Sequence, residues 1–401
     1  MNWSDRFAKC TALMKRSAVR EVLRLTARPD MISFAGGLPA AELFPLDRVR
    51  EASDAVLRNS GRQALQYGET EGLAPLRDWI AGQFSRPQFQ VQRENILITT
   101  GSQQALDLIG RVLLDEGDRV IVENPTYLAL LSAWRPVGVQ FLAASSDADG
   151  LRTDDLAPLL SQRPRLIYLT PNFQNPQGTT LTESRRKSLI ALAREHSVPI
   201  VEDNPYGELR YSGTALPNLL EIDAAANADP ELDSLVIYTG TFSKVLMPGL
   251  RVGWIIAARQ LIDKLVQAKQ GADLHTSTLC QHLALQMLND RVLDDFLPVL
   301  RRNYGERRDV MLDSLEKHFP KGATWFRPDG GMFLLASLPD SVNTAELLPE
   351  ALRRNVAFVP GEEFHLYGRG KNTMRLNFSS APPDRIEIGI ERLGDLLRAF
   401  A

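Results

Sequence analysis

The sequence predicts an α/β fold, with a large and mainly parallel mixed sheet flanked by helices plus a smaller α+β domain. From about residue 95 to 257, short apolar runs alternate with stretches of helical periodicity. Near-continuous apolar strands separated by helices indicate a parallel sheet that is covered on both faces. After residue 315, short strands and helices follow in mixed order. A chain of 401 residues is also too long for one simple core.

The first part of the chain supplies the large sheet. An amphipathic helix is expected over residues 11–28, a loop marked by glycine and proline over 32–39, and helices over 46–60 and 73–85. The expected strands are residues 96–100, 119–122, 166–169, 199–202, 235–238 and 254–257, and the helices between them lie near 102–115, 127–134, 153–161 and 183–196.

The second part begins with long helical stretches over residues 260–315. Strands are then expected at 330–335, 356–361 and 374–378, and helices at 344–354 and 383–399. We therefore expect an N-terminal helix and arm over residues 1–45 that packs with the small domain, a large ligand-binding domain over 46–290, and a small C-terminal domain over 291–401.

Composition and charge exclude several classes of function. The net charge of -3 gives no basic footprint for nucleic acid, and 44% hydrophobic with 24% charged residues is ordinary for a soluble globular enzyme. No apolar leader and no run of roughly 18 apolar residues is present, so we expect a cytoplasmic protein without membrane contact. The five histidines lack metal-ligand spacing, and Cys10 and Cys280 form no CxxC pair. No metal and a reducing compartment are expected.

Lys244 is the most informative residue of the chain. It follows the apolar run 235–238 and the hydroxyls of Thr241 and Ser243, and Arg251 stands seven residues further on. A lysine in this setting can form an imine with an aldehyde cofactor that also carries a phosphate, which points to pyridoxal 5'-phosphate (PLP). Most lysines are solvated surface charges, so the hypothesis depends on other segments that supply the remaining parts.

Two of these segments end strands of the predicted sheet, where ligands of such sheets bind. Ser102 is a good N-cap for the helix that follows strand 96–100, and the positive end of that helix attracts a phosphate. Asp203 ends strand 199–202 and would pair with a pyridinium nitrogen, whereas Glu202 should point to the other face by period-two alternation. An ordinary capped helix and a turn-capping aspartate are the alternative readings.

Polar and aromatic residues at the remaining strand ends complete the predicted site. Asn175, in an Asn-Pro turn, offers an amide to the ring oxygen of the cofactor, and Tyr206 could donate to the same oxygen. Tyr127 offers an aromatic face that could stack on the ring. Arg375 lies among apolar neighbours and needs a carboxylate partner, either within the chain or from the α-carboxylate of an amino acid.

Taken together, these segments closely resemble the class I/II PLP-dependent aminotransferases of fold type I, over essentially the whole chain from Ile32 to Arg375. The resemblance is strongest with the branch that contains 2-aminoadipate and kynurenine/2-aminoadipate aminotransferases. It is carried by the joint occurrence, in this order, of residues 32–39 (ISFAGGLP), 64–67 (ALQY), 99–107 (TTGSQQALD), 269–276 (KQGADLHT), 330–333 (GGMF) and 357–361 (AFVPG).

The resemblance implies a role for each site residue. Lys244 would carry the cofactor, Asp203 would pair with its ring nitrogen and Tyr127 would face the ring, which makes these three the expected catalytic residues. Thr241 stands where the family often has Ser or Gly. Asn172 stands where the nearest relatives often have Ser. The other expected cofactor ligands are Asn175 and Tyr206 at the ring oxygen, Ser102, Gln103, Ser243 and Arg251 at the phosphate, and Tyr67 reaching the phosphate from the partner subunit.

A homodimer with shared active sites is therefore expected. The substrate would be bound by Arg375, Gly37, Asn175 and Arg20, of which Arg20 resembles an arginine that contacts a distal carboxylate. Because Arg16, Arg20 and Arg24 are spaced by four residues, they could equally be a solvated helix face.

The expected reaction moves an amino group from an L-amino acid to a 2-oxo acid such as 2-oxoglutarate by a ping-pong mechanism. The expected donors are 2-aminoadipate or glutamate, and also leucine-like or aromatic amino acids. A PLP-dependent β-eliminating lyase shares most of the constellation. A ligand-sensing regulator that borrows this fold is a more distant alternative, because little more than thirty residues precede the loop at Gly36 and Gly37.

Overall fold

The computed structural model describes residues 1–25, 28, 30–227 and 232–400. Eight strands form the large sheet, in the order β2-β9-β8-β7-β6-β3-β4-β5. β3, β4, β6, β7 and β8 pair in parallel, whereas β9 runs antiparallel to β2 and β8, and β5 runs antiparallel to β4. The strands are β2 (Ile96–Thr99), β3 (Arg119–Asn124), β4 (Gln140–Asp147), β5 (Gly150–Leu151), β6 (Leu166–Leu169), β7 (Ile200–Asp203), β8 (Val236–Thr241) and β9 (Gly253–Ile256).

All six strands expected from apolar runs are present, and β4 and β5 are additional. β4 lies next to the edge of the sheet, and only one of its eight residues is buried. It therefore lacks the continuous apolar run that marks the interior strands. Strand β5 has only two residues, which is too short to give any pattern.

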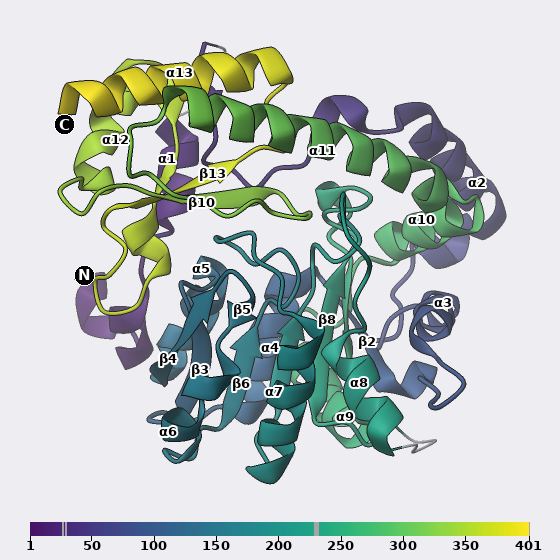
Figure 1. Ribbon diagram of the computed structural model, residues 1–401. Helices are drawn as coiled ribbons and strands as arrows, with labels where there is room; N and C mark the ends of the chain where they lie inside the picture. The colour runs from purple at the N-terminus through teal and green to yellow at the C-terminus, as the bar shows by residue number, and fades with distance from the viewer. Residues whose placement is uncertain (26–27, 29, 228–231, 401) are drawn as a thin grey trace.

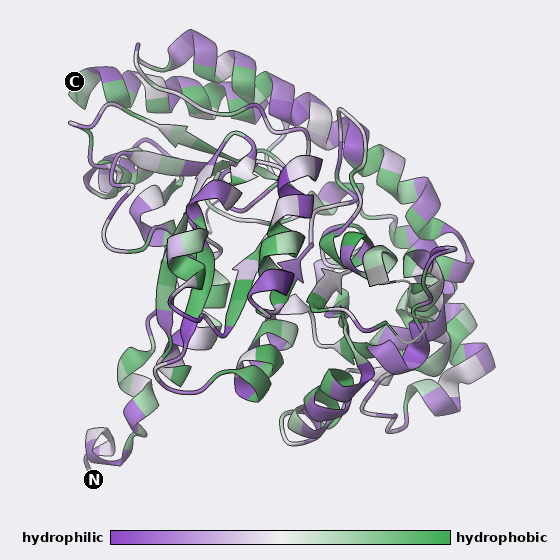
Figure 2. Cartoon of the chain, turned by 60° about the horizontal axis from the view of Figure 1, so that its bottom comes forward, coloured by the Kyte–Doolittle hydropathy of each residue, from purple (hydrophilic) through white to green (hydrophobic). Residues whose placement is uncertain are grey.

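Helices cover both faces of this sheet, and the strand residues alternate between two hydrophobic cores (Figure 1). In β6, Ile167 and Leu169 belong to one core, whereas Leu166 and Tyr168 belong to the other. Figure 2 shows the apolar strands at the centre, with polar residues on the outer turns of the covering helices. The helices of this part are α2 (Leu46–Ala64), α3 (Ala74–Phe84), α4 (Ser102–Leu113), α5 (Leu128–Trp134), α6 (Ala157–Leu160), α7 (Glu183–Glu195), α8 (Leu219–Asn227), α9 (Arg259–Gln270) and α10 (Thr278–Asn289).

A second, smaller sheet lies above the carboxyl ends of the large one (Figure 1). Its antiparallel strands have the order β10-β13-β12, and the short strand β1 pairs in parallel with β11 beside it. The elements of this part are β1 (Ile32–Ser33), β10 (Phe333–Ser337), β11 (Val356–Ala357), β12 (Val359–Pro360), β13 (Thr373–Asn377), α12 (Thr344–Arg353) and α13 (Pro383–Phe400).

The 27-residue helix α11 (Val292–His318) connects the two parts. Phe296 and Leu300 in its first half pack in a core of the large sheet, whereas Met311 and Leu315 in its second half pack in the core of the small sheet. The expected division at residues 290 and 291 stays a prediction, and the change of core within α11 falls further along the chain, between Leu300 and Met311.

The N-terminal helix is shorter than the sequence suggested. Helix α1 covers Ala18–Leu25, and a 3₁₀ helix covers Lys9–Leu13. Ser17 caps α1, since its Oγ accepts a hydrogen bond from the backbone N–H of Arg20 at 3.4 Å. Residues 26 and 27 of the expected helix lie outside the described residues. The other 3₁₀ helices are Trp3–Arg6, Ala41–Leu43, Arg93–Asn95, Arg135–Val137, Thr153–Asp155, Pro248–Leu250 and Gly361–Phe364.

Within the described ranges, no helix combines the length and the apolar character that crossing a bilayer requires.

Gly110 of α4 lies where this helix packs closely against Trp134 of α5. A Cβ atom on Gly110 would lie 2.6 Å from the ring of the buried Trp134, whose Nε1 donates to the carbonyl of Leu106 at 2.8 Å. Gly110→Ala should therefore lower the free energy of unfolding by about 1–3 kcal/mol through overpacking. Gly82 in α3 has open space around it, so Gly82→Ala should raise that free energy by about 0.5–1 kcal/mol. Chemical denaturation of both variants measures the two changes, and equal signs would contradict this packing.

Candidate active site

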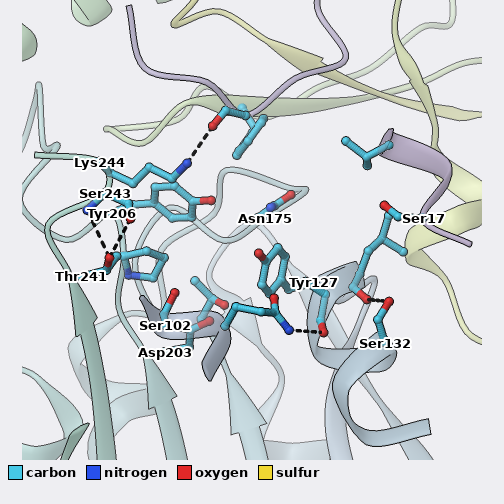
Figure 3. A pocket seen from close by; sticks show the side chains of 18 of the residues that line it. Ser17, Ser102, Tyr127, Ser132, Asn175, Asp203, Tyr206, Thr241, Ser243 and Lys244 are labelled. Atoms are coloured by element: carbon cyan, nitrogen blue, oxygen red, sulfur yellow. Dashed lines mark hydrogen bonds between the residues drawn. The ribbon is translucent and has the colours of Figure 1, made fainter. Parts of the chain in front are cut away.

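A cavity of about 660 Å³ lies between the carboxyl ends of the large sheet and the small sheet. Figure 3 shows its side chains converging from both parts of the chain. Twelve of the thirteen residues predicted for the site line this cavity, and Tyr67 is the exception. The twelve are Arg20, Gly37, Ser102, Gln103, Tyr127, Asn175, Asp203, Tyr206, Ser243, Lys244, Arg251 and Arg375.

The start of α4 forms an anion-binding cup. The N-cap is Gly101 and not Ser102, which is the first helical residue and leaves its own N–H free of an intrahelical acceptor. Gly101 has φ 78°, and a Cβ there would lie 2.4 Å from Nη2 of Arg251. The turn therefore requires glycine because the guanidinium packs directly on it.

Arg251 is held over this cup by oxygen atoms. Its Nη1 donates to Ser243 Oγ and to the carbonyl of Pro248, both at 3.3 Å, and its Nη2 donates to the carbonyl of Thr100 at 3.4 Å. The positive end of α4, two serine hydroxyls and one guanidinium thus face a common space. This donor set suits a phosphate.

Lys244 follows β8 and points into the cavity (Figure 3). Its Nζ donates to the carbonyl of Gly37 at 2.7 Å. Burial, and then the positive charges of Arg375 and Arg251, lower the pKa of Lys244 to about 8. Gly37 itself must be glycine, because a Cβ would lie 2.8 Å from the ring of Phe333.

Asp203 is the last residue of β7, and its carboxylate is buried. It accepts hydrogen bonds from Tyr168 Oη at 2.7 Å and Thr239 Oγ1 at 2.8 Å. Burial raises its pKa, and none of the salt bridges between described residues involves it. Glu202 points to the other face, as alternation predicts, and accepts from the backbone N–H groups of Leu219 and Leu220. A cationic ligand atom beside Asp203 would supply the missing charge.

Arg375 reaches the cavity from β13 of the small sheet. Its Nη1 donates to Asn175 Oδ1 at 2.9 Å and its Nη2 to the carbonyl of Ala35 at 2.6 Å. Its Nε has no acceptor among the described residues. The guanidinium lies over the rings of Phe333 and Phe364, at 4.3 and 4.8 Å from their centroids. Burial lowers its pKa to about 10, so the group stays charged at neutral pH.

Two tyrosines complete the wall around Asp203. Burial is the main cause that raises the pKa of Tyr127 to about 12, and it raises the pKa of Tyr206 further. Both phenols are therefore protonated at neutral pH and can donate a hydrogen bond. The ring of Tyr206 packs edge-on against Phe333, with centroids 5.9 Å apart.

The two positions that depart from the related sequences have clear partners. Thr241 Oγ1 donates to Ser243 Oγ at 3.0 Å and accepts from the N–H of Ser243 at 3.1 Å. Asn172 accepts from the buried Arg186 at 2.7 Å and donates to Asn204 at 3.0 Å. Both side chains thus fix the loops that carry site residues.

Tyr67 lies outside the cavity of its own chain. Its side chain is 79% exposed and packs against His275, with ring centroids 5.7 Å apart. The expectation that it serves the site of a partner subunit stays a prediction.

Several cavity residues were missed from the sequence. Phe333 and Phe364 stack on Arg375, and Lys15 and Ser17 line the mouth beside Arg20. The only sequence signal for Phe333 was its place in the block 330–333, and isolated phenylalanines are otherwise indistinguishable from core residues. Within the described chain, no group of three or more His, Cys, Asp or Glu side chains could hold a metal ion.

Comparison with known proteins identifies the family. Residues 29–393 match the family model of aminotransferase class I and II. The chain is 43% identical over 401 residues to the 2-aminoadipate transaminase of Thermus thermophilus, covering 100% of this chain and 98% of the relative. It is 42% identical over 408 residues to aromatic-amino-acid aminotransferase 1 of Thermococcus litoralis, covering 99% of this chain and 95% of the relative.

A solved structure agrees with this result. The crystal structure of the α-aminoadipate aminotransferase of Thermus thermophilus, complexed with N-(5'-phosphopyridoxyl)-L-leucine, matches with a TM-score of 0.92 at 42% identity. The match covers 100% of this chain and 99% of that chain. The chain therefore belongs to the class I and II aminotransferases, with the fold-type I structure of that family.

The low pKa of Lys244 should be measurable as a stability difference. Because the folded-state pKa of about 8 lies below the ordinary 10.5, the unfolded chain binds more protons between these pH values. On the ligand-free protein, the free energy of unfolding of the wild type should rise relative to Lys244→Met as pH increases from about 8 to 10.5, by at most about 3 kcal/mol. Denaturant titrations across this range measure it, with Lys264→Met as the exposed-lysine control. A difference that does not change with pH would contradict the shift.

Proposed function

We propose that this aminotransferase transfers the amino group of an L-amino acid to a 2-oxo acid such as 2-oxoglutarate, in two ping-pong half-reactions. The donors are 2-aminoadipate or glutamate, and also leucine-like or aromatic amino acids. The observation that carries the proposal is the buried Arg375, which shares a cavity with Lys244. Among the described residues, its guanidinium donates to the amide oxygen of Asn175 and to the carbonyl of Ala35, so the carboxylate that it needs comes from a substrate.

The cofactor is PLP, and the residues of the cavity fit it. Ser102, Gln103, Ser243 and Arg251 hold the phosphate at the start of α4. Asp203 pairs with the ring nitrogen and thereby gains the cation that its buried carboxylate lacks within the described chain. Tyr127 faces the ring, and Asn175 and Tyr206 donate to the ring oxygen. When bound, PLP supplies an aldehyde carbon for amine attachment and a ring that withdraws electrons from the substrate's Cα.

Lys244 has two tasks in this site. Its Nζ would hold the cofactor in the resting enzyme, and as a free amine it would take the proton from the substrate's Cα. A pKa of about 8 leaves about one molecule in ten neutral at pH 7, compared with one in a few thousand at 10.5. Arg375 contributes to this shift and also binds the α-carboxylate, next to Gly37 and Asn175. The same positive charge therefore positions the substrate and favours the neutral base.

The residues at the mouth of the cavity support the proposed preference for certain substrate side chains. Among the described residues that line the cavity, five are basic and one, Asp203, is acidic. Arg251 and Arg375 are assigned to the phosphate and the α-carboxylate, which leaves Lys15 and Arg20 at the mouth. A distal carboxylate would be attracted there. The apolar residues Val19, Leu23, Leu128 and Phe364 line the same region and suit leucine-like or aromatic side chains.

The proposed working unit is a homodimer with shared sites. Leu65, Tyr67 and Leu274 are exposed apolar or aromatic side chains outside the cavity. In the proposed dimer, this surface contacts a second copy, and Tyr67 reaches the phosphate of the partner.

Lys244→Ala should lower turnover by at least about a hundredfold, because it removes the general base. The matched control is Lys264→Ala, an exposed lysine of α9 that should keep wild-type activity. An amino-acid panel with 2-oxoglutarate as acceptor, followed by detection of the new oxo acid, measures both variants. A Lys244→Ala protein with the parent rate would exclude the assignment. Release of pyruvate and ammonia from cysteine without any oxo acid would favour a β-eliminating lyase instead.

Arg20→Ala should lower kcat/KM for 2-aminoadipate and glutamate by about tenfold and leave leucine nearly unchanged. Arg20 is exposed, which places the effect at the low end for a charged contact. Arg24→Ala is the control, because Arg24 lies one turn further on and does not line the cavity. Equal losses for leucine and 2-aminoadipate in Arg20→Ala would remove Arg20 from substrate recognition.

A further inference from the structure

An ion pair between the buried Lys269 and the partly exposed Asp273 lies next to the phosphate-binding cup. Lys269, in the last turn of α9, is 0% exposed, and its Nζ contacts Asp273 Oδ1 at 2.8 Å and Oδ2 at 3.0 Å. Neither residue lines the substrate cavity. Burying the Lys269 ammonium is costly unless it is fully bonded, so the pair is weak evidence for a contribution to stability alone. Its surroundings indicate a second role.

The pair is hydrogen-bonded to both ends of the cup. Gln104 Oε1 accepts from Lys269 Nζ at 2.7 Å and from the N–H of Thr100 at 2.8 Å. Asp273 Oδ2 accepts from Gln104 Nε2 at 2.7 Å and from Thr100 Oγ1 at 2.9 Å. Thr100 immediately precedes Gly101, and Gln104 lies in the first turn of α4. The ion pair thus holds the residues on either side of the turn that presents the N–H groups of Ser102 and Gln103.

The same network reaches the guanidinium of the cup. The carbonyl of Thr100 accepts from Arg251 Nη2, so all three polar groups of Thr100 are bonded. Because Lys269 and Asp273 neutralise each other, they add little net field at the phosphate position. Their effect on a bound anion must come from geometry, by keeping the donors aligned before the ligand arrives.

We propose that Lys269 and Asp273 are positioning residues that pre-align the phosphate-binding turn of the cofactor site. The proposal rests on the PLP assignment above, and it deepens that assignment by naming what holds the cup in shape. It also predicts a specific signature. Loss of the pair should weaken binding of pyridoxal 5'-phosphate and leave binding of pyridoxal, which lacks the phosphate, nearly unchanged.

The test titrates both aldehydes into the cofactor-depleted full-length protein and follows their absorbance. In Lys269→Met, the Kd for PLP should rise about tenfold, whereas the Kd for pyridoxal should change less than about twofold. Turnover at saturating PLP should fall by a smaller factor than the affinity does. Arg194→Met is the control, because Arg194 pairs with the fully buried Asp223 away from the cavity. It should leave both Kd values near wild type.

Equal loss of affinity for both aldehydes in Lys269→Met, or no loss for either, would overturn the proposal. If Lys269→Met fails to fold, Thr100→Val decides, since it removes only the hydroxyl, which bonds to Asp273 and to the hydroxyl of Thr276. Thr100→Val should raise the Kd for PLP by less than Lys269→Met does and should leave the Kd for pyridoxal nearly unchanged. Equal changes in both Kd values would overturn the proposal. A wild-type protein that binds neither aldehyde would instead contradict the cofactor assignment.

Discussion

The site depends on positive charge gathered around one buried amine. Lys244 shares its cavity with Arg251 and Arg375, and these neighbours together with burial bring its pKa to about 8. Such a group of cations is stable only when anions neutralise it or when one member gives up its proton. Phosphate and carboxylate are the anions that match guanidinium donors. The need for a phosphorylated cofactor, for a carboxylic substrate and for a neutral lysine thus follows from a single electrostatic imbalance.

The fold produces this imbalance by joining ends of separate elements. Lys244 and Asp203 follow strands of the large sheet, whereas Arg375 belongs to the small sheet and comes from 131 positions further along the chain than Lys244. The bond from Arg375 to Asn175 connects the small sheet to the loop that follows β6 of the large sheet. Phe333, the first residue of β10, supplies the ring on which the guanidinium stacks. Each charged group is therefore fixed by a different part of the framework.

Much of this arrangement could be predicted from the sequence because interior parallel strands are apolar and end in polar motifs. The apolar runs predict six consecutive strands of the sheet, from β2 at one edge to β3, and period-two alternation separates Asp203 from Glu202. Strand β4 escaped prediction because its half-exposed residues have no such run. The N-cap of α4 was wrongly placed at Ser102, because the choice of Gly101 depends on contact with Arg251, which is distant in sequence.

The same limit applies to the electrostatics. Arg375 lowers the pKa of Lys244 more than Arg251 does, although Arg251 stands only seven residues from Lys244 and nothing local in the sequence links Lys244 to Arg375. The sequence marks Thr100 and Gln104 only as members of the block 99–107, and Lys269 and Asp273 only as members of the block 269–276. It does not show that they form one network, because the hydrogen bonds join residues about 170 positions apart. The pKa of Lys244 and this hydrogen-bond network depend on such tertiary contacts, which local sequence patterns do not specify.

Helix α11 has a mechanical consequence. It is embedded in the core of the large sheet at one end and in the core of the small sheet at the other, so each core could open while the helix stays anchored in its counterpart. In the proposed complex, an amino acid in contact with both Arg375 and Lys244 would span these cores and would be lost when either one opened. Its binding would therefore couple two otherwise separable unfolding events, and the loaded enzyme should melt more cooperatively than the empty one.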